Sequence, residues 1–261
     1  MRETVTMWRY TKMVVLTALT AAVYAALLIP FKGIPLVPGF TEVRVGTVVP
    51  VVFGILFGPA GAWGSALGNL IGDFFGTLGP GTLFGFIGNF FFALVSYKVG
   101  NRIFGSSGQE IMTLRTVREI VGFIAAVLIS AVVCSLIISW GLELLGLYPF
   151  KIIAPIIILN NSVVPILIGP FLLLLLYPRM VRWDLLWGEI MDNEDISTPR
   201  YPGLGVLLIF LGGVGGMAVG ISISLGFLSA PNFLSGLTAS GLLVTAVVPF
   251  LLILFLGCLL S

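Results

Sequence analysis

Apolar runs of about the length needed to cross a bilayer recur along the whole chain, separated by short stretches rich in polar residues, glycine or proline. A helix needs about 20 apolar residues to span the hydrocarbon core. The pattern therefore predicts an all-α integral membrane protein with eight transmembrane helices. Their predicted ranges are 12–30, 46–58, 60–76, 83–103, 120–147, 152–177, 204–228 and 237–260.

The stretch 46–76 fits either two short helices or one long tilted helix, and the decision rests on Gly58 and Pro59. Proline lacks an amide donor and disfavours helix at the residue before it. Two helices and a cytoplasmic N-terminus place ten basic residues inside and three outside, whereas one fused helix gives at best nine and four. The positive-inside rule favours the break. The three outside residues are Lys32, Arg44 and Lys151.

Two longer polar interruptions, 104–119 and 178–203, divide the chain. Within the second, residues 179–190 place Trp183, Leu186, Trp187 and Ile190 on one helical face, which is typical of a helix lying in the membrane interface. An acidic cytoplasmic linker follows. We expect a six-span substrate-binding unit (1–178), an interfacial helix with its linker (179–203) and a C-terminal transmembrane hairpin (204–261).

Composition narrows the possible functions. The chain is 58% hydrophobic and 9% charged, with a mean hydropathy of +1.15, so no sizeable soluble domain and no nucleic-acid partner are expected. Histidine is absent, no phosphate-binding loop occurs, and Cys134 and Cys258 lie in apolar segments. We therefore expect no metal, redox cofactor or disulfide. If transport uses ATP, other subunits must hydrolyse it.

Five polar residues interrupt the apolar helices, and we interpret them as the lining of one shared cavity. Unpaired amides and carboxylates are costly in hydrocarbon and usually face a cavity or a partner. Two alternatives stay open: Asp73 caps the loop 77–82 or pairs with Arg44, and the amides bond between helices. The five residues are Asn69, Asp73, Asn89, Asn160 and Asn161.

The loop after the first predicted span carries Glu42 and Arg44 among prolines and glycines. It is long enough to fold over the mouth of a cavity, so we interpret it as a lid whose two charged residues join the binding site. An exposed hairpin with a solvated ion pair is the alternative.

Small residues form two predicted packing faces. Gly61, Gly64, Gly68, Gly72 and Gly76 make a stripe along the third predicted span, which a neighbouring helix or a ligand could approach closely. In the first span, Ala18, Ala22 and Ala26 form a face suited to docking another transmembrane helix, although packing within the chain would explain it equally well.

The segment "FTEVRVGTVVPVVFGILFGPAGAWGSALGNLIGDFFG", followed by "GFIGNF", resembles the S component of energy-coupling factor vitamin transporters. The resemblance is strongest over 40–100, extends by topology over 1–178, and is nearest to the riboflavin-type branch. It implies a plasma-membrane subunit that captures a vitamin-like molecule from outside. A transmembrane coupling subunit and two ATPases would drive uptake, and the alanine face of the first span would dock the coupling subunit. The C-terminal hairpin departs from the usual six spans.

Three other functions fit the sequence less well. A stand-alone secondary transporter would need ion-coupling carboxylates near the midplane and commonly shows an inverted repeat, of which only Gly68-Asn69 and Gly88-Asn89 give a hint. A membrane scaffold would bind no solute. An enzyme is least favoured, because catalysis needs a positioned acid, base, nucleophile or metal.

Overall fold

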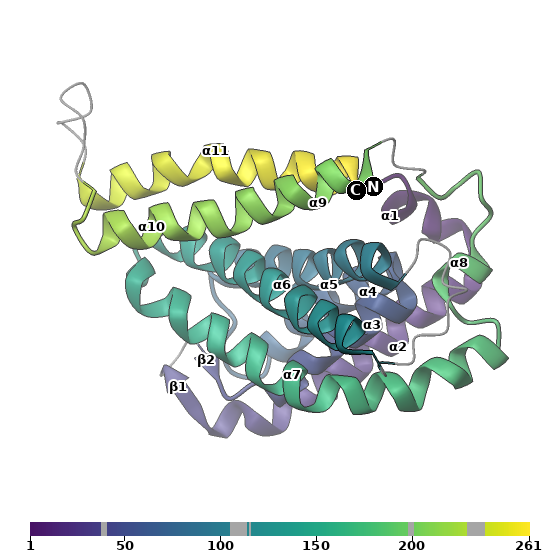
Figure 1. Cartoon of the computed structure of the whole chain (residues 1–261). Coiled ribbons are helices and arrows are strands. Elements are labelled where there is room, and N and C mark those ends of the chain that lie inside the picture. The colour runs from purple at the N-terminus through teal and green to yellow at the C-terminus, as the bar shows by residue number, and fades with distance from the viewer. Residues whose placement is uncertain (38–40, 105–113, 115, 198–200, 229–237) are drawn as a thin grey trace.

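The computed structural model describes residues 1–37, 41–104, 114, 116–197, 201–228 and 238–261, which form a helical bundle with one small β-hairpin (Figure 1). The N-terminal half contains α1 (Glu3–Thr6), α2 (Thr11–Leu28), β1 (Pro35–Val37), β2 (Thr41–Glu42), α3 (Val48–Phe57), α4 (Pro59–Asp73) and α5 (Thr82–Phe104). The remainder contains α6 (Val117–Leu144), α7 (Phe150–Arg182), α8 (Trp187–Ile190), α9 (Pro202–Phe210), α10 (Gly216–Ser224) and α11 (Ala239–Leu260). A π-helical turn, Leu211–Gly215, joins α9 to α10.

Six stretches of the described chain are long and apolar enough to cross a membrane, and they confirm an all-α membrane protein. They are α2 with its following turn, α5, α6, α7 with α8, α9 to α10, and α11. Helices α3 and α4 have 10 and 15 residues, so each falls short of the usual spanning length. The count of eight spans and the C-terminal hairpin as a transmembrane unit stay predictions.

The predicted break at Gly58 and Pro59 is confirmed. Gly58 has a φ of +52°, a left-handed conformation that glycine adopts without the steric cost of a side chain. Helix α4 then runs parallel to α2, because Gly64 lies against Thr20 and Gly72 lies against Leu28. One continuous helix over 46–76 is excluded.

The glycine stripe packs helices together. A Cβ at Gly64 would lie 2.4 Å from the Cβ of Thr20, and one at Gly68 would lie 2.9 Å from the carbonyl oxygen of Ala21. Only glycine allows α4 to approach α2 this closely.

The alanines of α2 divide between its two sides. Ala21 and Ala25 are buried toward α4, while Ala18, Ala22 and Ala26 are exposed on the outer surface. The predicted docking face is therefore exposed in the part of the chain that the structure describes.

The predicted continuous helix over 179–190 is wrong. Helix α7 extends to Arg182, and the chain turns at Asp184 (φ 50°) before the short α8 begins. Trp183 is 58% exposed, but Trp187 is buried, with its ring centroid 5.0 Å from that of Tyr97. Trp187 also covers Gly58, so it belongs to the core of the bundle.

Both termini lie at one end of the bundle, and β1–β2 lies at the other (Figure 1). At the terminal end, the buried Lys98 donates hydrogen bonds to Glu3 Oε1 at 2.6 Å and to the carbonyl oxygen of Ser261 at 2.5 Å. Burial raises the pKa of Glu3, but Lys98 and the hydroxyl of Ser197 outweigh burial and lower it to about 2. This cluster joins α1, α5 and α11. The cytoplasmic placement of this end stays a prediction.

Candidate substrate-binding site

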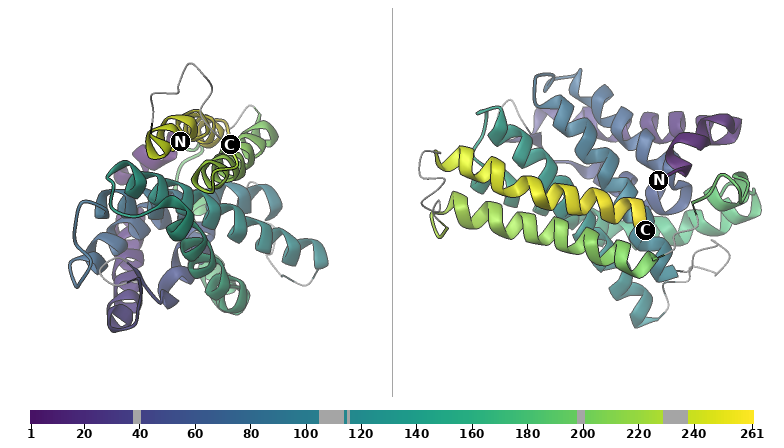
Figure 2. Two further views of the ribbon diagram at one scale, coloured as in Figure 1. Left: turned by 90° about the vertical axis from the view of Figure 1, so that its left-hand side faces the viewer. Right: turned by 90° about the horizontal axis from the view of Figure 1, so that it is seen from above.

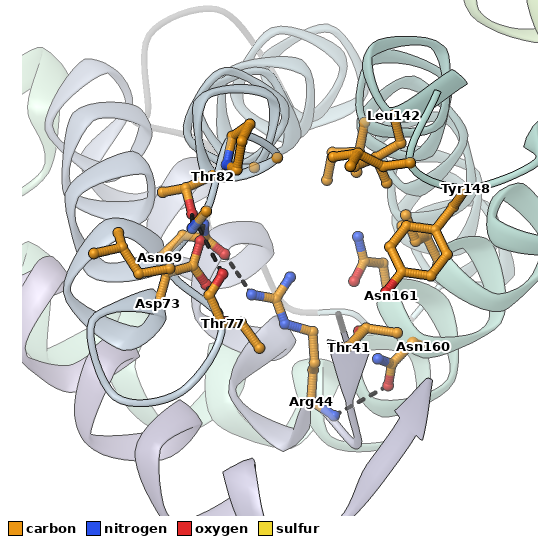
Figure 3. Close-up of a pocket in the computed structure, with 18 residues that line it drawn as sticks. Thr41, Arg44, Asn69, Asp73, Thr77, Thr82, Leu142, Tyr148, Asn160 and Asn161 are labelled. Carbon is orange, nitrogen blue, oxygen red and sulfur yellow. Dashed lines mark hydrogen bonds between the residues drawn. The ribbon is translucent and has the colours of Figure 1, made fainter. Parts of the chain in front are cut away.

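A cavity of about 220 Å³ lies at the end of the bundle that carries β1–β2 (Figure 3). One wall comes from the end of α4, the following loop and the start of α5, and the opposite wall comes from α6 and α7. Residues 41–44, here called the lid, contribute Thr41 and Arg44. The cavity is lined by Thr41, Arg44, Asn69, Asp73, Thr77, Leu78, Gly79, Pro80, Gly81, Thr82, Gly85, Ile138, Leu142, Leu147, Tyr148, Ile157, Asn160 and Asn161.

Asp73 ends α4 and is held by neighbouring side chains. The hydroxyl of Thr77 donates to Asp73 Oδ1 at 3.0 Å, and the amide of Asn69 donates to Oδ2 at 3.2 Å. Lys32, in the turn after α2, lies 3.6 Å from Oδ1. The carboxylate therefore lines the cavity and also fixes the loop that follows α4, as the capping alternative expects, while its role in binding stays a prediction.

Arg44 reaches from the lid into the cavity and donates to Asn69 Oδ1 (Figure 3). Its Nε lies 3.5 Å from Glu42 Oε1. Burial by itself lowers the pKa of Arg44, but Tyr24, Glu42 and Asp73 outweigh burial, so the pKa lies above its usual value. The guanidinium is therefore a permanent positive charge at the cavity wall.

The lid is fixed by ion pairs that balance in charge. Lys32 Nζ lies 3.1 Å from Glu42 Oε1 and donates to Thr77 Oγ1 at 2.6 Å. Lys32 and Arg44 thus offset Glu42 and Asp73. Uncompensated charges in such a buried place would carry a large desolvation penalty.

Helix α7 supplies adjacent amides with different roles. Asn160 accepts from the backbone N–H of Arg44 at 3.1 Å and donates to the carbonyl of Glu42 at 2.8 Å. Asn160 therefore anchors the lid. Asn161 donates to Cys134 Sγ at 3.3 Å, while its Oδ1 is buried and has no hydrogen-bond partner. Figure 3 shows Asn161 on the wall opposite Asn69 and Asp73.

Of the seven residues proposed from the sequence, five line the cavity: Arg44, Asn69, Asp73, Asn160 and Asn161. Glu42 is not among the lining residues and forms ion pairs with Lys32 and Arg44. Asn89 lies outside the lining, where it accepts from the hydroxyl of Tyr24 at 2.8 Å and donates to the carbonyl of Gly85 at 2.8 Å. Its contacts match the alternative of bonding between helices.

The sequence interpretation did not include Lys32 and Thr77. A signal for Lys32 was present, because it is one of three basic residues on the side that the positive-inside rule leaves poor in charge. Arg44 is the second of these. Two of these three basic residues thus lie at the site, and Lys151 lies outside it.

Comparison with known proteins decides the family. The model of the QueT transporter matches residues 14–178. The chain belongs to the QueT transporter family. Membership confirms the predicted resemblance to S components and a role in transport across the membrane. The matched branch is QueT, so the expectation of a riboflavin-type branch is corrected.

The QueT match covers every lining residue of the cavity and ends before α9, α10 and α11. No curated protein and no solved structure gives a significant match. Family and helix composition together indicate a multi-pass transport protein of the plasma membrane that takes a small-molecule substrate.

Replacing Lys32 by methionine should loosen the lid. The change leaves two carboxylates facing one cation and removes the charged hydrogen bond to Thr77, which contributes about 1.5–3 kcal/mol. Amide hydrogen exchange at residues 41–47 should become about tenfold faster or more. Hydrogen exchange with mass spectrometry measures this in the detergent-solubilised chain.

Lys151→Met is the matched control, because Lys151 is exposed and lies outside the lid contacts. Adding Glu42→Gln to Lys32→Met restores the charge balance and should slow the exchange again. Equal lid exchange in Lys32→Met and Lys151→Met would show that the ion pairs do not hold the lid.

Proposed function

We propose that this chain is an S component that captures a queuosine precursor from outside the cell for ATP-driven uptake. The observation that carries the proposal is the small polar cavity beneath the lid, which holds a buried acceptor without a partner. An unpaired buried acceptor costs free energy, and a bound ligand that donates a hydrogen bond removes that cost. QueT is an S component for uptake of a queuosine precursor.

The charge balance of the cavity favours an uncharged ligand. Lys32 and Arg44 offset Glu42 and Asp73, so a charged ligand would enter without a counter-charge and lose its hydration. The volume of about 220 Å³ lies below the 300–1,000 Å³ that is common for drug-sized ligands, which favours a compact molecule.

The polar groups define the pattern that the ligand must offer. Asn161 Oδ1 requires a donor, and the guanidinium of Arg44 requires an acceptor. A nucleobase edge presents ring N–H donors next to a carbonyl oxygen, and queuosine is a nucleoside. A queuosine precursor therefore suits this cavity and replaces the vitamin expected from the resemblance.

The pairing of the carboxylates argues against ion-coupled secondary transport by this chain alone. Such transporters need carboxylates available to a proton or a sodium ion. Asp73 has Lys32, Thr77 and Asn69 as partners, and Glu42 lies between Lys32 and Arg44. ATP-driven uptake through a separate coupling subunit and two ATPases is the mechanism that we favour.

The exposed face of Ala18, Ala22 and Ala26 supports docking of the coupling subunit. Small residues let two transmembrane helices approach each other closely. The face lies on α2, the helix that leads directly into the turn carrying Lys32. With a cytoplasmic N-terminus, the lid end would face the outside.

Replacing Asn161 by leucine should weaken ligand binding while stabilising the empty protein. The change removes a hydrogen bond of about 0.5–1.5 kcal/mol from the complex, so affinity for a queuosine precursor should fall about two- to twelve-fold. The same change removes an unpaired buried acceptor, so the ligand-free melting temperature should rise. Calorimetry and thermal unfolding measure the two effects.

Asn89→Leu is the control, since both polar ends of Asn89 are already bonded within the chain. It should lower the melting temperature. If Asn161→Leu binds like the parent chain, Asn161 has no part in recognition.

Replacing Ala22 by leucine should leave ligand affinity unchanged and weaken association with the coupling subunit, because a bulky side chain separates the helices. Co-purification with the coupling subunit measures the loss. Leu19→Ala makes an exposed side chain of α2 smaller instead of larger and serves as the comparison. If Ala22→Leu co-purifies with the coupling subunit at the parental level, this face does not dock the coupling subunit.

A further inference from the structure

Helices α10 and α11 pack against the end of α6 and the start of α7, close to the cavity. The contact buries one apolar cluster: Leu136, Phe150, Ala154, Met217, Ile223, Leu242, Leu243 and Val247. These C-terminal helices lie outside the range that matches the QueT family, so the function proposed above gives them no role.

Helix α6 lies between the cavity and the C-terminal helices. Ile138 and Leu142 line the cavity, while Leu136 and Trp140 contact the C-terminal helices. Residues two apart in a helix point to nearly opposite sides. A displacement of α10 or α11 would therefore act directly on the back of the cavity wall.

Trp140 connects α11 to the cavity through a chain of contacts. Its indole N–H donates to the carbonyl of Val244 at 3.0 Å, and its ring centroid lies 6.0 Å from that of Phe84, with the planes at 81°. Phe84 lies directly over Gly141, where a Cβ would be 2.0 Å from its ring. Phe84 precedes Gly85, which lines the cavity.

Phe150 makes the equivalent connection at the start of α7. A Cβ at Gly220 of α10 would lie 2.8 Å from the Phe150 ring, so no space is left between them. The N–H of Phe150 donates to Glu143 of α6 at 2.6 Å. Leu147 and Tyr148, just before Phe150, line the cavity.

We propose that α10 and α11 brace the α6–α7 wall of the cavity, with Trp140 and Phe150 as positioning residues for ligand binding. The inference rests on the proposed function in taking this cavity as the ligand site. Figure 2 shows the C-terminal helices and α2 on different sides of the bundle, so the brace leaves the exposed alanine face free.

The first test needs no ligand and compares Trp140→Phe with Trp63→Phe. Each change keeps an aromatic ring and removes one indole N–H bond to a backbone carbonyl; the bond of Trp63 goes to Thr4, away from the cavity. Hydrogen exchange at residues 142–150 should become faster in Trp140→Phe and stay at the parental rate in Trp63→Phe. Equal exchange in both variants would overturn the brace.

The second test measures affinity for a queuosine precursor by calorimetry. Trp140→Phe should weaken binding about two- to twelve-fold, and Gly220→Val, which forces α10 away from Phe150, should weaken it further. Gly257→Val forces the end of α11 away from α9, more than three helical turns beyond Val244, and should preserve affinity. Parental affinity in both Trp140→Phe and Gly220→Val would contradict the proposal.

Thermodynamic linkage between ligand binding and the brace provides a third test, whose result a purely structural contact would not change. If the brace and the ligand stabilise the same wall, the ligand must in turn strengthen the brace. Saturating precursor should therefore slow exchange in α10 and in residues 239–248 of the parent chain, and unchanged exchange there would count against the brace. If the parent fails to bind the precursor, the proposed ligand is wrong, and the ligand-free exchange comparison still decides the brace.

Discussion

The cavity depends on four charges at the lid that neutralise one another: Glu42, Arg44 and Asp73 are buried, and Lys32 is partly buried. Lys32 lies between Glu42 and Asp73, and Arg44 extends past Glu42 to Asn69. Removing any one partner would leave a buried charge uncompensated, which is strongly destabilising. The lid therefore has one preferred position, and the amide of Asn160 fixes the lid backbone to α7. One buried acceptor without a hydrogen-bond partner among the described residues, Asn161 Oδ1, lies on the wall that faces this network.

Close helix packing brings these charges together. Because α4 runs parallel to α2 and its glycines touch α2, both helices end at the same level of the bundle. The turn carrying Lys32 then lies beside Asp73 at the end of α4. Gly58 makes this possible, since its left-handed conformation lets the chain reverse between α3 and α4.

The sequence predicted those parts of the fold that local chemistry determines. The length of the apolar runs identified the long helices, and Gly58-Pro59 identified the break. Both signals are local in the sequence and do not depend on distant contacts. The polar residues of α4 and α7 were identified because hydrocarbon makes unpaired polar groups costly. Asn89 was grouped with them, yet its partner Tyr24 is 65 residues away in the chain, and no local pattern reveals such a pair.

Residues 179–190 show a second limit of local patterns. Their periodicity fits an amphipathic helix, but Trp187 finds a buried site over Gly58 and against Tyr97, and the chain turns at Asp184 to reach it. Tertiary packing overrode the local preference. Lys32 was missed for a related reason, since its role depends on the parallel packing of α2 and α4.

Native mass spectrometry tests the central claim most directly. The chain would be purified in mild detergent, stripped of small molecules and incubated with equal amounts of a queuosine precursor and riboflavin. We expect a single bound molecule with the mass of the precursor, and no riboflavin adduct. A riboflavin adduct, or an empty chain with both compounds in excess, would contradict an uncharged, nucleobase-like ligand in the cavity beneath the lid.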